Sequence, residues 1–220
     1  MTSRLSKTVA TADRVPVDFT FKQSSCVAVG TFNIYIVQPK LLGEMGVFET
    51  DQSVLISGDL TRPGIRFEVN NATWTVRPDR LSVESKAPNV DCGLFVERTL
   101  AALCWTQIMG VGVNCVFTSP AESESQLPGN LSLPIHPDAT QRTSHLSIPR
   151  GDSVLNLQMT HSDNQLELSL NMHTDFSQKK GDSKEVNESV RSICGSFMDL
   201  RTSAVDFANG LLEAEFIYDR

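Results

Sequence analysis

Hydrophobic and polar residues alternate along residues 73–84, which read TWTVRPDRLSVE. The pair Pro78-Asp79 interrupts this alternation, and proline fits the second position of a type I turn. Folding the segment about that pair predicts a β-hairpin whose apolar residues share one face. The predicted cross-strand pairs are Arg77–Arg80, Val76–Leu81, Thr75–Ser82, Trp74–Val83 and Thr73–Glu84. We therefore expect the charges beside the turn to be the solvated end of a hairpin, with a binding site at its tip as the alternative.

Residues 154–173, which read VLNLQMTHSDNQLELSLNMH, repeat the alternation on both sides of Ser162-Asp163. Folding about that pair predicts a second hairpin. Its apolar pairs are Met159–Leu166, Leu157–Leu168 and Leu155–Leu170, and its polar pairs are Gln158–Glu167 and Asn156–Ser169. Each hairpin then has one apolar face and one polar face. That arrangement is typical of an antiparallel sheet that helices cover on one side only.

A helical period follows the first hairpin over residues 89–107, where Asn89 or Asp91 can serve as the N-cap. The apolar stripe of this helix consists of Cys92, Val96, Leu100 and Leu103. Residues 108–119, which read IMGVGVNCVFTS, then indicate a strand. Because a helix also follows the second hairpin, we expect two similar hairpin–helix halves. This is a repeat of architecture without residue-by-residue identity.

The last helix gives the most regular pattern in the chain. Its apolar residues are spaced alternately by four and three, and they are Val186, Val190, Ile193, Phe197, Leu200, Ala204, Phe207 and Leu211. Asp182 or Ser183 offers an N-cap, and Asn209-Gly210 offers a stop. A continuous helix would span roughly 27 residues and about 40 Å. A break near Thr202-Ser203 is the alternative.

This stripe has two interpretations. It packs across the chain's own sheet, or its C-terminal half packs on a second chain, as the spacing of a helix–helix seam allows. The candidate interface residues are Phe197, Leu200, Ala204, Phe207 and Leu211.

Four segments ahead of the first hairpin indicate strands, namely residues 17–22, 31–38, 53–58 and 64–70. Residues 41–45 indicate a short helical turn. Residues 119–144 are rich in Ser, Pro and Asn without an apolar period, which indicates a linker or long loop. The expected fold class is α+β with a predominantly antiparallel sheet. The expected organisation is a flexible arm over 1–14, a strand-rich unit with one helix over 15–118, the linker over 119–144, and a second hairpin with a long helix over 145–220.

Composition narrows the classes of function. Hydrophobic residues make up 40% and charged residues 20% of the chain, as in an ordinary globular protein. The net charge of −7 argues against a phosphate-binding face, so we expect no nucleic-acid partner. The longest wholly apolar run, residues 100–105, falls far short of the roughly 20 residues of a membrane span. The N-terminus lacks the apolar region of a secretory signal, so the expected location is the cytoplasm.

No motif for catalysis, cofactors or metals stands out. The five cysteines, Cys26, Cys92, Cys104, Cys115 and Cys194, are widely spaced and lie mostly in apolar runs, as reduced buried thiols do. Cys104 and Cys194 have no histidine nearby in sequence to generate a thiolate. The histidines His136, His145, His161 and His173 lack metal-ligand spacing. GVGVN at residues 110–114 is not a dinucleotide fingerprint.

These observations predict a non-catalytic protein-interaction or assembly module that binds a protein partner or a second copy of itself. No cofactor, metal or membrane contact is expected. The alternative is a binder of an apolar small molecule, or an enzyme without a recognisable motif, that uses a cavity between sheet and helix. The candidate lining of that cavity is Phe67, Trp74, Phe95 and Met159.

Overall fold

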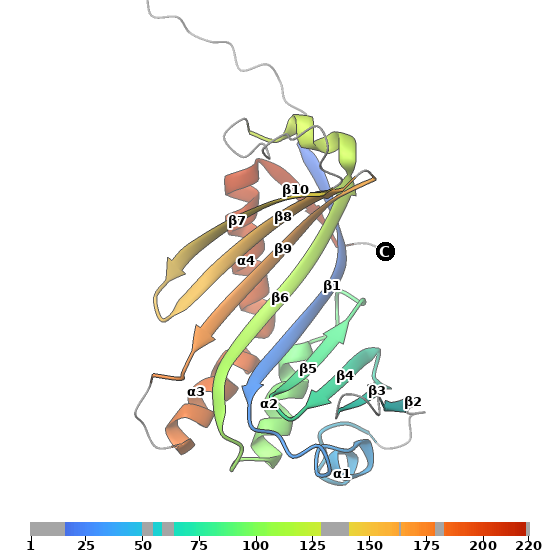
Figure 1. Ribbon diagram of the computed structural model, residues 1–220, viewed down its shortest axis with the longest axis vertical. Coiled ribbons are helices and arrows are strands. Elements are labelled where there is room, and N and C mark those ends of the chain that lie inside the picture. The colour runs from blue at the N-terminus through green and yellow to red at the C-terminus, as the bar shows by residue number, and fades with distance from the viewer. Residues whose placement is uncertain are drawn as a thin grey trace, which may run out of the picture.

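The computed structural model describes residues 16–49, 55–58, 64–128, 141–162, 164–178 and 183–218. These residues form an α+β fold with one ten-stranded, mostly antiparallel sheet (Figure 1). The strands are β1 (Val17–Gly30), β2 (Leu55–Gly58), β3 (Ile65–Val69), β4 (Ala72–Arg77), β5 (Arg80–Ser85), β6 (Ile108–Pro120), β7 (Gln141–Arg150), β8 (Ser153–Ser162), β9 (Gln165–Asp175) and β10 (Ala214–Ile217). The helices are α1 (Pro39–Glu44), α2 (Cys92–Ala102), the 3₁₀ helix η1 (Ala121–Gln126), α3 (Ser183–Gly195) and α4 (Phe197–Leu212).

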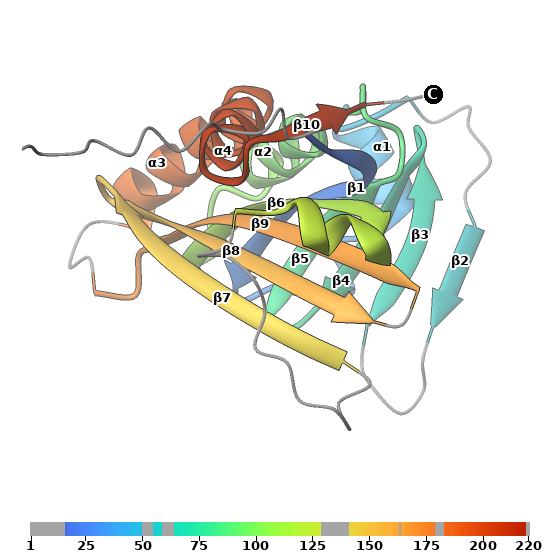
Figure 2. The same cartoon turned by 90° about the horizontal axis from the view of Figure 1, so that it is seen from above.

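The strands follow the order β2-β3-β4-β5-β1-β6-β9-β8-β7, with β10 parallel to the start of β1. The two long strands β1 and β6 pair in the middle, so the sheet is continuous from β2 at one edge to β7 at the other. Figure 2 shows α2, α3 and α4 together on one side of this sheet. We call that side the helix face and the opposite side, which Figure 1 looks onto, the outer face.

The register of the first hairpin is confirmed, and that of the second is wrong. In the first, Trp74 lies opposite Val83 and Arg77 opposite Arg80. In the second, the turn lies between Ser162 and Gln165, one residue later than expected, so Leu157 lies opposite Leu170. A partner shifted by two positions keeps its face, because side chains alternate with a period of two. The apolar pattern therefore suits both registers and does not distinguish them.

The expected helix of residues 89–107 is the shorter helix α2, and Asp91 caps it by accepting a hydrogen bond from the backbone N–H of Leu94. The expected long C-terminal helix is two helices. Ser196 separates α3 from α4 with φ −94° and ψ 15°, away from helical values. Gly195 and Ser196 are both weaker helix formers than alanine, which favours a break here. The alternative break near Thr202-Ser203 is wrong, because these residues lie within α4.

The helices pack closely against the sheet and against one another. A methyl group added to Gly93 of α2 would come within 2.1 Å of the backbone oxygen of Cys194 and 2.2 Å of Phe197 Cβ. Only glycine permits this approach. Beneath α2, the ring of Trp74 stacks on Phe67 with centroids 5.4 Å apart and contacts Phe95 at 5.7 Å. This aromatic cluster fills the space between sheet and helix in the first half of the chain.

Two segments differ from expectation. Residues 31–38 form turns after β1 instead of a strand. Residues 119–144, expected as a linker, hold the end of β6, η1 and the start of β7, and residues 129–140 lie outside the described residues. The arm expected at residues 1–14 also lies outside them. Among the described helices, none combines the length and apolar character that a membrane crossing demands.

Candidate functional site

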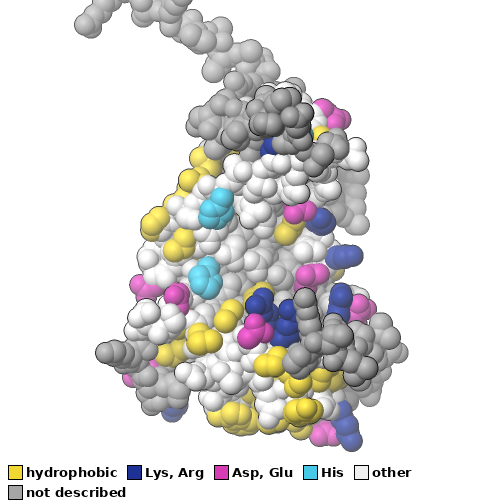
Figure 3. All heavy atoms as spheres, in the orientation of Figure 1, with side chains coloured by type: hydrophobic (Ala, Val, Ile, Leu, Met, Phe, Trp, Pro, Cys, Tyr) yellow, Lys and Arg dark blue, Asp and Glu magenta, His cyan; other side chains and the backbone are white. Residues whose placement is uncertain are grey.

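An exposed apolar surface lies at the end of the molecule that carries α1. Tyr35 is 79% exposed and Trp105 is 63% exposed, the two highest values among the large hydrophobic residues described. Figure 3 shows hydrophobic side chains gathered at this lower end. Single exposed apolar residues are ordinary, but exposed tryptophan and tyrosine side chains at one end of a molecule are typical of binding surfaces. We call the surface around Tyr35 and Trp105 the aromatic end.

Two loops build the aromatic end, and backbone hydrogen bonds hold them. The N–H of Thr31 donates to the carbonyl of Gln107 at 2.9 Å, which joins the loop after β1 to the loop after α2. The N–H of Phe32 donates to the carbonyl of Pro78 at 2.9 Å, which joins the first loop to the turn of the β4–β5 hairpin. The hairpin turn therefore supports a surface loop, and its charges lie beside that contact.

A hollow of about 390 Å³ opens between these loops. Its apolar lining comes from Phe32, Ile36, Val37, Leu103 and Trp105. Phe32, Val37 and Leu103 are buried and form the floor, whereas Trp105 is mostly exposed. The hollow is large enough for one or two side chains of a partner.

A second feature is a row of hydrogen-bonded side chains on the outer face, which we call the polar row. It crosses five neighbouring strands through Ser25 of β1, Asn114 of β6, Asn171 of β9, Asn156 of β8 and Ser147 of β7. The amide of Asn171 donates to Asn114 Oδ1, and the amide of Asn156 donates to Asn171 Oδ1 at 3.1 Å. Ser147 Oγ donates to Asn156 at 2.7 Å, and Asn114 donates to Ser25 Oγ at 3.2 Å. Each member holds its neighbour in one orientation, so the row is rigid and uncharged.

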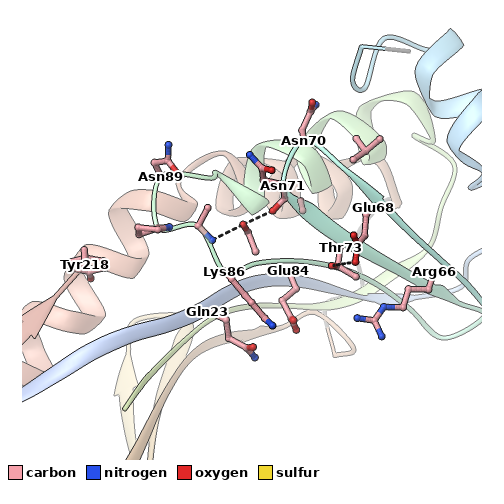
Figure 4. Close-up of a pocket in the computed structure, with 15 residues that line it drawn as sticks. Gln23, Arg66, Glu68, Asn70, Asn71, Thr73, Glu84, Lys86, Asn89 and Tyr218 are labelled. Atoms are coloured by element: carbon pink, nitrogen blue, oxygen red, sulfur yellow. Dashed lines mark hydrogen bonds between the residues drawn. The ribbon is translucent and has the colours of Figure 1, made fainter. Parts of the chain in front are cut away.

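A third feature is an open groove of about 1290 Å³ beside the ends of β3, β4 and β5 (Figure 4). Figure 4 shows the side chains of Gln23, Lys86 and Glu84 close together on one side of the strands, with Arg66 further along. Among the described residues, Lys86 and Arg66 form no ion pair. The groove therefore offers two free cationic groups and the Glu84 carboxylate to a polar ligand.

Charged side chains also meet where η1 joins the end of the sheet. Arg142 donates to both oxygens of Glu124, at 3.2 and 2.7 Å, and also contacts His161 Nδ1. His161 Nδ1 lies 3.4 Å from Glu124 Oε2. The side chains satisfy one another and hold η1 against β7 and β8. This cluster has a structural explanation and needs no ligand.

Four of the cysteines are buried, and Cys104 is exposed in the turn after α2, so the expectation of buried thiols is wrong for Cys104. Cys26 Sγ lies 3.8 Å from Cys194 Sγ. This contact and burial raise the pKa of Cys26 well above 9.0, and burial raises the pKa of Cys92 and Cys115 to about 12. Thiols held in the neutral form are poor nucleophiles. In the described part of the chain, no His, Cys, Asp and Glu side chains gather in a way that could hold a metal ion.

The structure uses most of the candidate interface residues for the core. Phe197 and Ala204 are 0% and 3% exposed, so a second chain cannot reach them in this fold. Leu200, Phe207 and Leu211 are half-buried at the margin of the core. Only the outer edges of these three side chains remain for a partner.

The candidate cavity residues do not lie together. Phe67, Trp74 and Phe95 belong to the aromatic cluster beneath α2, whereas Met159 lies on β8, beyond the central strands. Phe67, Trp74 and Met159 are at most 1% exposed. Their side chains pack as core in two separate places.

Sequence reasoning missed the aromatic end. Trp105 lies two positions after Leu103, and residues two apart do not share a helix face. The sequence therefore indicated that Trp105 lies outside the apolar stripe of α2, and this was the available sign of its exposure. Tyr35 was placed in a strand that does not form. No known family model matches this chain, and comparison with curated proteins finds no relative.

Proposed function

We propose that this chain is a non-catalytic protein-interaction module and that the aromatic end is its binding surface. The observation that carries the proposal is the exposure of Trp105 beside an apolar hollow with a buried floor. A tryptophan left 63% exposed forgoes much of the free energy that burial would give, and a partner that covers it recovers that free energy. Tryptophan and tyrosine are also the residues most enriched at the energetic centres of interfaces.

The expected partner is a folded protein or peptide that inserts an apolar side chain into the hollow while its backbone lies against Tyr35 and Trp105. The loops are already held by backbone hydrogen bonds to the hairpin turn and to Gln107. Binding therefore costs little ordering of the surface. Truncating such an anchor typically weakens binding by about 2 kcal/mol or more, or at least about thirtyfold in Kd.

The test compares partners cross-linked to wild-type protein, Trp105→Ala and the matched control Leu94→Ala in extract of the source cells. Leu94 is 37% exposed in the first turn of α2, away from the hollow. We expect a specific set of proteins with wild type and Leu94→Ala that is lost with Trp105→Ala. Each captured protein is then purified and its Kd measured by calorimetry against the three variants. Equal affinity for wild type and Trp105→Ala would refute the proposal.

We also infer that the sheet consists of two similar halves. The arrangement of β1 through β5 with α2 resembles that of β6 through β9 with α3 and α4, because each half starts with a long central strand and ends with a helix. Within each half the remaining strands follow outward in reverse chain order. The outer face then serves as a solvated face that both halves share, and its polar row crosses the junction between them. Self-association through the half-buried residues Leu200, Phe207 and Leu211 of α4 remains a separate proposal.

A second candidate function is binding of a small zwitterionic molecule in the groove of Figure 4, which the free cationic groups Lys86 and Arg66 and the nearby Glu84 favour. The sequence predicted an apolar ligand in a cavity between sheet and helix, whereas this groove favours a charged, polar ligand. Thermal unfolding with a panel of free amino acids tests it. A shift with wild type that Lys86→Ala removes supports this function, and no shift with any amino acid refutes it.

A further inference from the structure

Among the described residues, β7 is the last strand at one edge of the sheet. Within the described part of the chain it pairs only with β8, over all ten of its residues. Most of its side chains are exposed, and Leu146 is 39% exposed. Figure 3 shows hydrophobic side chains along the edge where β7 lies. A long open edge is a template for pairing with another strand, and proteins usually protect it with charged side chains, proline or a bulge. In β7 such residues stand only near the two ends, at Arg142, Pro149 and Arg150, and residues 143–148 contain no lysine, arginine, acidic residue or proline.

The turn between β7 and β8 shows which backbone groups face outward. Gly151 and Asp152 form a two-residue turn, with Arg150 opposite Ser153. The pair that flanks such a turn is hydrogen-bonded, and hydrogen-bonded pairs then recur at every second residue. The odd-numbered residues Thr143, His145 and Ser147 therefore direct their N–H and C=O groups away from β8. Pro149 also stands at an outward position, where its missing N–H costs no bond to β8.

We propose that a second copy of this chain pairs with β7 in antiparallel fashion about a two-fold axis at Leu146. In this register the two Leu146 side chains lie opposite each other in a non-hydrogen-bonded pair, where side chains approach most closely. His145 of each copy lies opposite Ser147 of the other and exchanges backbone hydrogen bonds with it. The exposed Leu146 side chains of the two copies thus bury each other, and the open edge is paired in both copies.

The charges of β7 permit this register. It places Arg142 of one copy opposite Arg150 of the other, but both guanidinium groups already have partners within their own chain. Glu124 binds Arg142 through both oxygens. Arg150 lies over the ring of Phe207 of α4, 4.3 Å from its centroid. Both side chains are thus held toward their own chain, which reduces the repulsion across the axis.

The same register brings the second copy toward Phe207, a half-buried residue of α4. Ser144 and Leu146 share the helix face of the strand with Ile148, which lies opposite Ser144 of the second copy. Arg150 connects this face to Phe207. A second β7 strand therefore extends the apolar helix face toward Phe207 without reaching the buried residues Phe197 and Ala204. The interface is small for a permanent dimer, so we expect a dimer that dissociates on dilution.

The first experiment measures the mass of the full chain by sedimentation over a range of concentrations. We expect a monomer–dimer equilibrium for wild type. Leu146→Asp places two carboxylates opposite each other and should raise the dimer Kd by at least about a hundredfold. Leu94→Asp is the matched control, because Leu94 is similarly exposed at 37% but lies on α2. It should leave the Kd unchanged. A wild-type monomer at every concentration, or equal dimerisation of Leu146→Asp and wild type, would overturn the proposal.

The second experiment tests the register by cross-linking. Cysteines at Leu146 are introduced into a Cys104→Ser background, which removes the one exposed thiol among the described residues. Oxidised glutathione accepts the two electrons released as the disulfide forms. Non-hydrogen-bonded pairs have the short Cβ separation that a disulfide needs. We expect rapid covalent dimerisation of Leu146→Cys and slow dimerisation of Leu94→Cys, and equal rates would refute the register. Trp105→Ala should dimerise normally, so failure of the proposed function and failure of this proposal are distinguishable.

Discussion

Two neighbouring residues of β6 show how the two faces of the sheet differ. Phe117 lies on the helix face, is 0% exposed and meets Phe21, Phe216 and Tyr218 with ring centroids 4.9 to 5.8 Å apart. Val116 lies on the outer face, is half-buried and stands opposite Ser169 of β9. The helix face contributes stability through burial of apolar area, whereas the outer face is held by side-chain hydrogen bonds across strands.

The difference shows which face is free to serve binding. A buried residue on the helix face, such as Phe117, contacts other elements, so its replacement disturbs the whole fold. Residues at the rim and on the outer face, such as Trp105 and Asn171, can change with smaller effects on stability. The proposed binding surface and the open edge at β7 both lie outside the main contact between sheet and helices.

The largest loss of stability is expected when a buried residue of the helix face is replaced. Phe117→Ala should lower the free energy of unfolding by about 3–5 kcal/mol, because it removes a buried ring that contacts three other aromatic rings. Val116→Ala, one residue away, should cost less than about 1 kcal/mol, since Val116 is half-buried. Urea unfolding followed by circular dichroism measures both. Equal losses in the free energy of unfolding would show that the two faces contribute equally to stability.

A smaller effect is expected from the polar row. Asn171→Ala removes hydrogen bonds to both Asn114 and Asn156, which should cost about 1–2 kcal/mol. Ser169→Ala, at a similarly half-buried outer position of β9, should change stability by less than about 0.5 kcal/mol. A double-mutant cycle with Asn114→Ala should show coupling between the two amides. Additive effects in that cycle would mean that the row is not cooperative.

Near neutral pH the smallest effect comes from the buried thiols, because their contribution to stability changes only at alkaline pH. Burial raises the pKa of the Cys92 and Cys115 thiols from 9.0 to about 12, and unfolding returns them to the ordinary value. The stability that these neutral thiols contribute is complete below pH 9 and is lost as the pH rises toward 12, because the unfolded state then releases protons that the folded state retains. Urea unfolding at a series of pH values measures the decline. Cys115→Ala should show a shallower decline than wild type, and an identical decline would contradict this assignment.

The sequence predicted local structure where alternation and turn chemistry agreed. The β4–β5 hairpin forms with the expected pairs because only one turn, at Pro78-Asp79, suits its pattern. The β8–β9 hairpin offers two neighbouring turns that keep the same faces, so its register could not be read from the pattern. The strand β7 was missed because it is an edge strand with few buried residues, and such a strand has a weak apolar period.

The candidate site could be predicted only in part. The polar row draws its members from five strands, and no spacing along the chain shows that Ser25, Asn114 and Asn171 lie side by side. The helical stripe of residues 186–211 was recognised, but the burial of Phe197 comes from the close approach of α2 at Gly93, which no local pattern shows.

The amino-acid sequence alone determined which residues of each hairpin turn toward the core, because the period of two is a property of every strand. It also narrowed the cap of α2 to Asn89 or Asp91, since a cap acts on the neighbouring backbone, and the structure shows that Asp91 is the cap. Only the tertiary structure decided that β1 and β6 join all strands into one sheet, that Trp105 stays exposed, and that β7 is left at an edge. Those outcomes depend on contacts between residues far apart in the chain, where many arrangements satisfy the same local pattern.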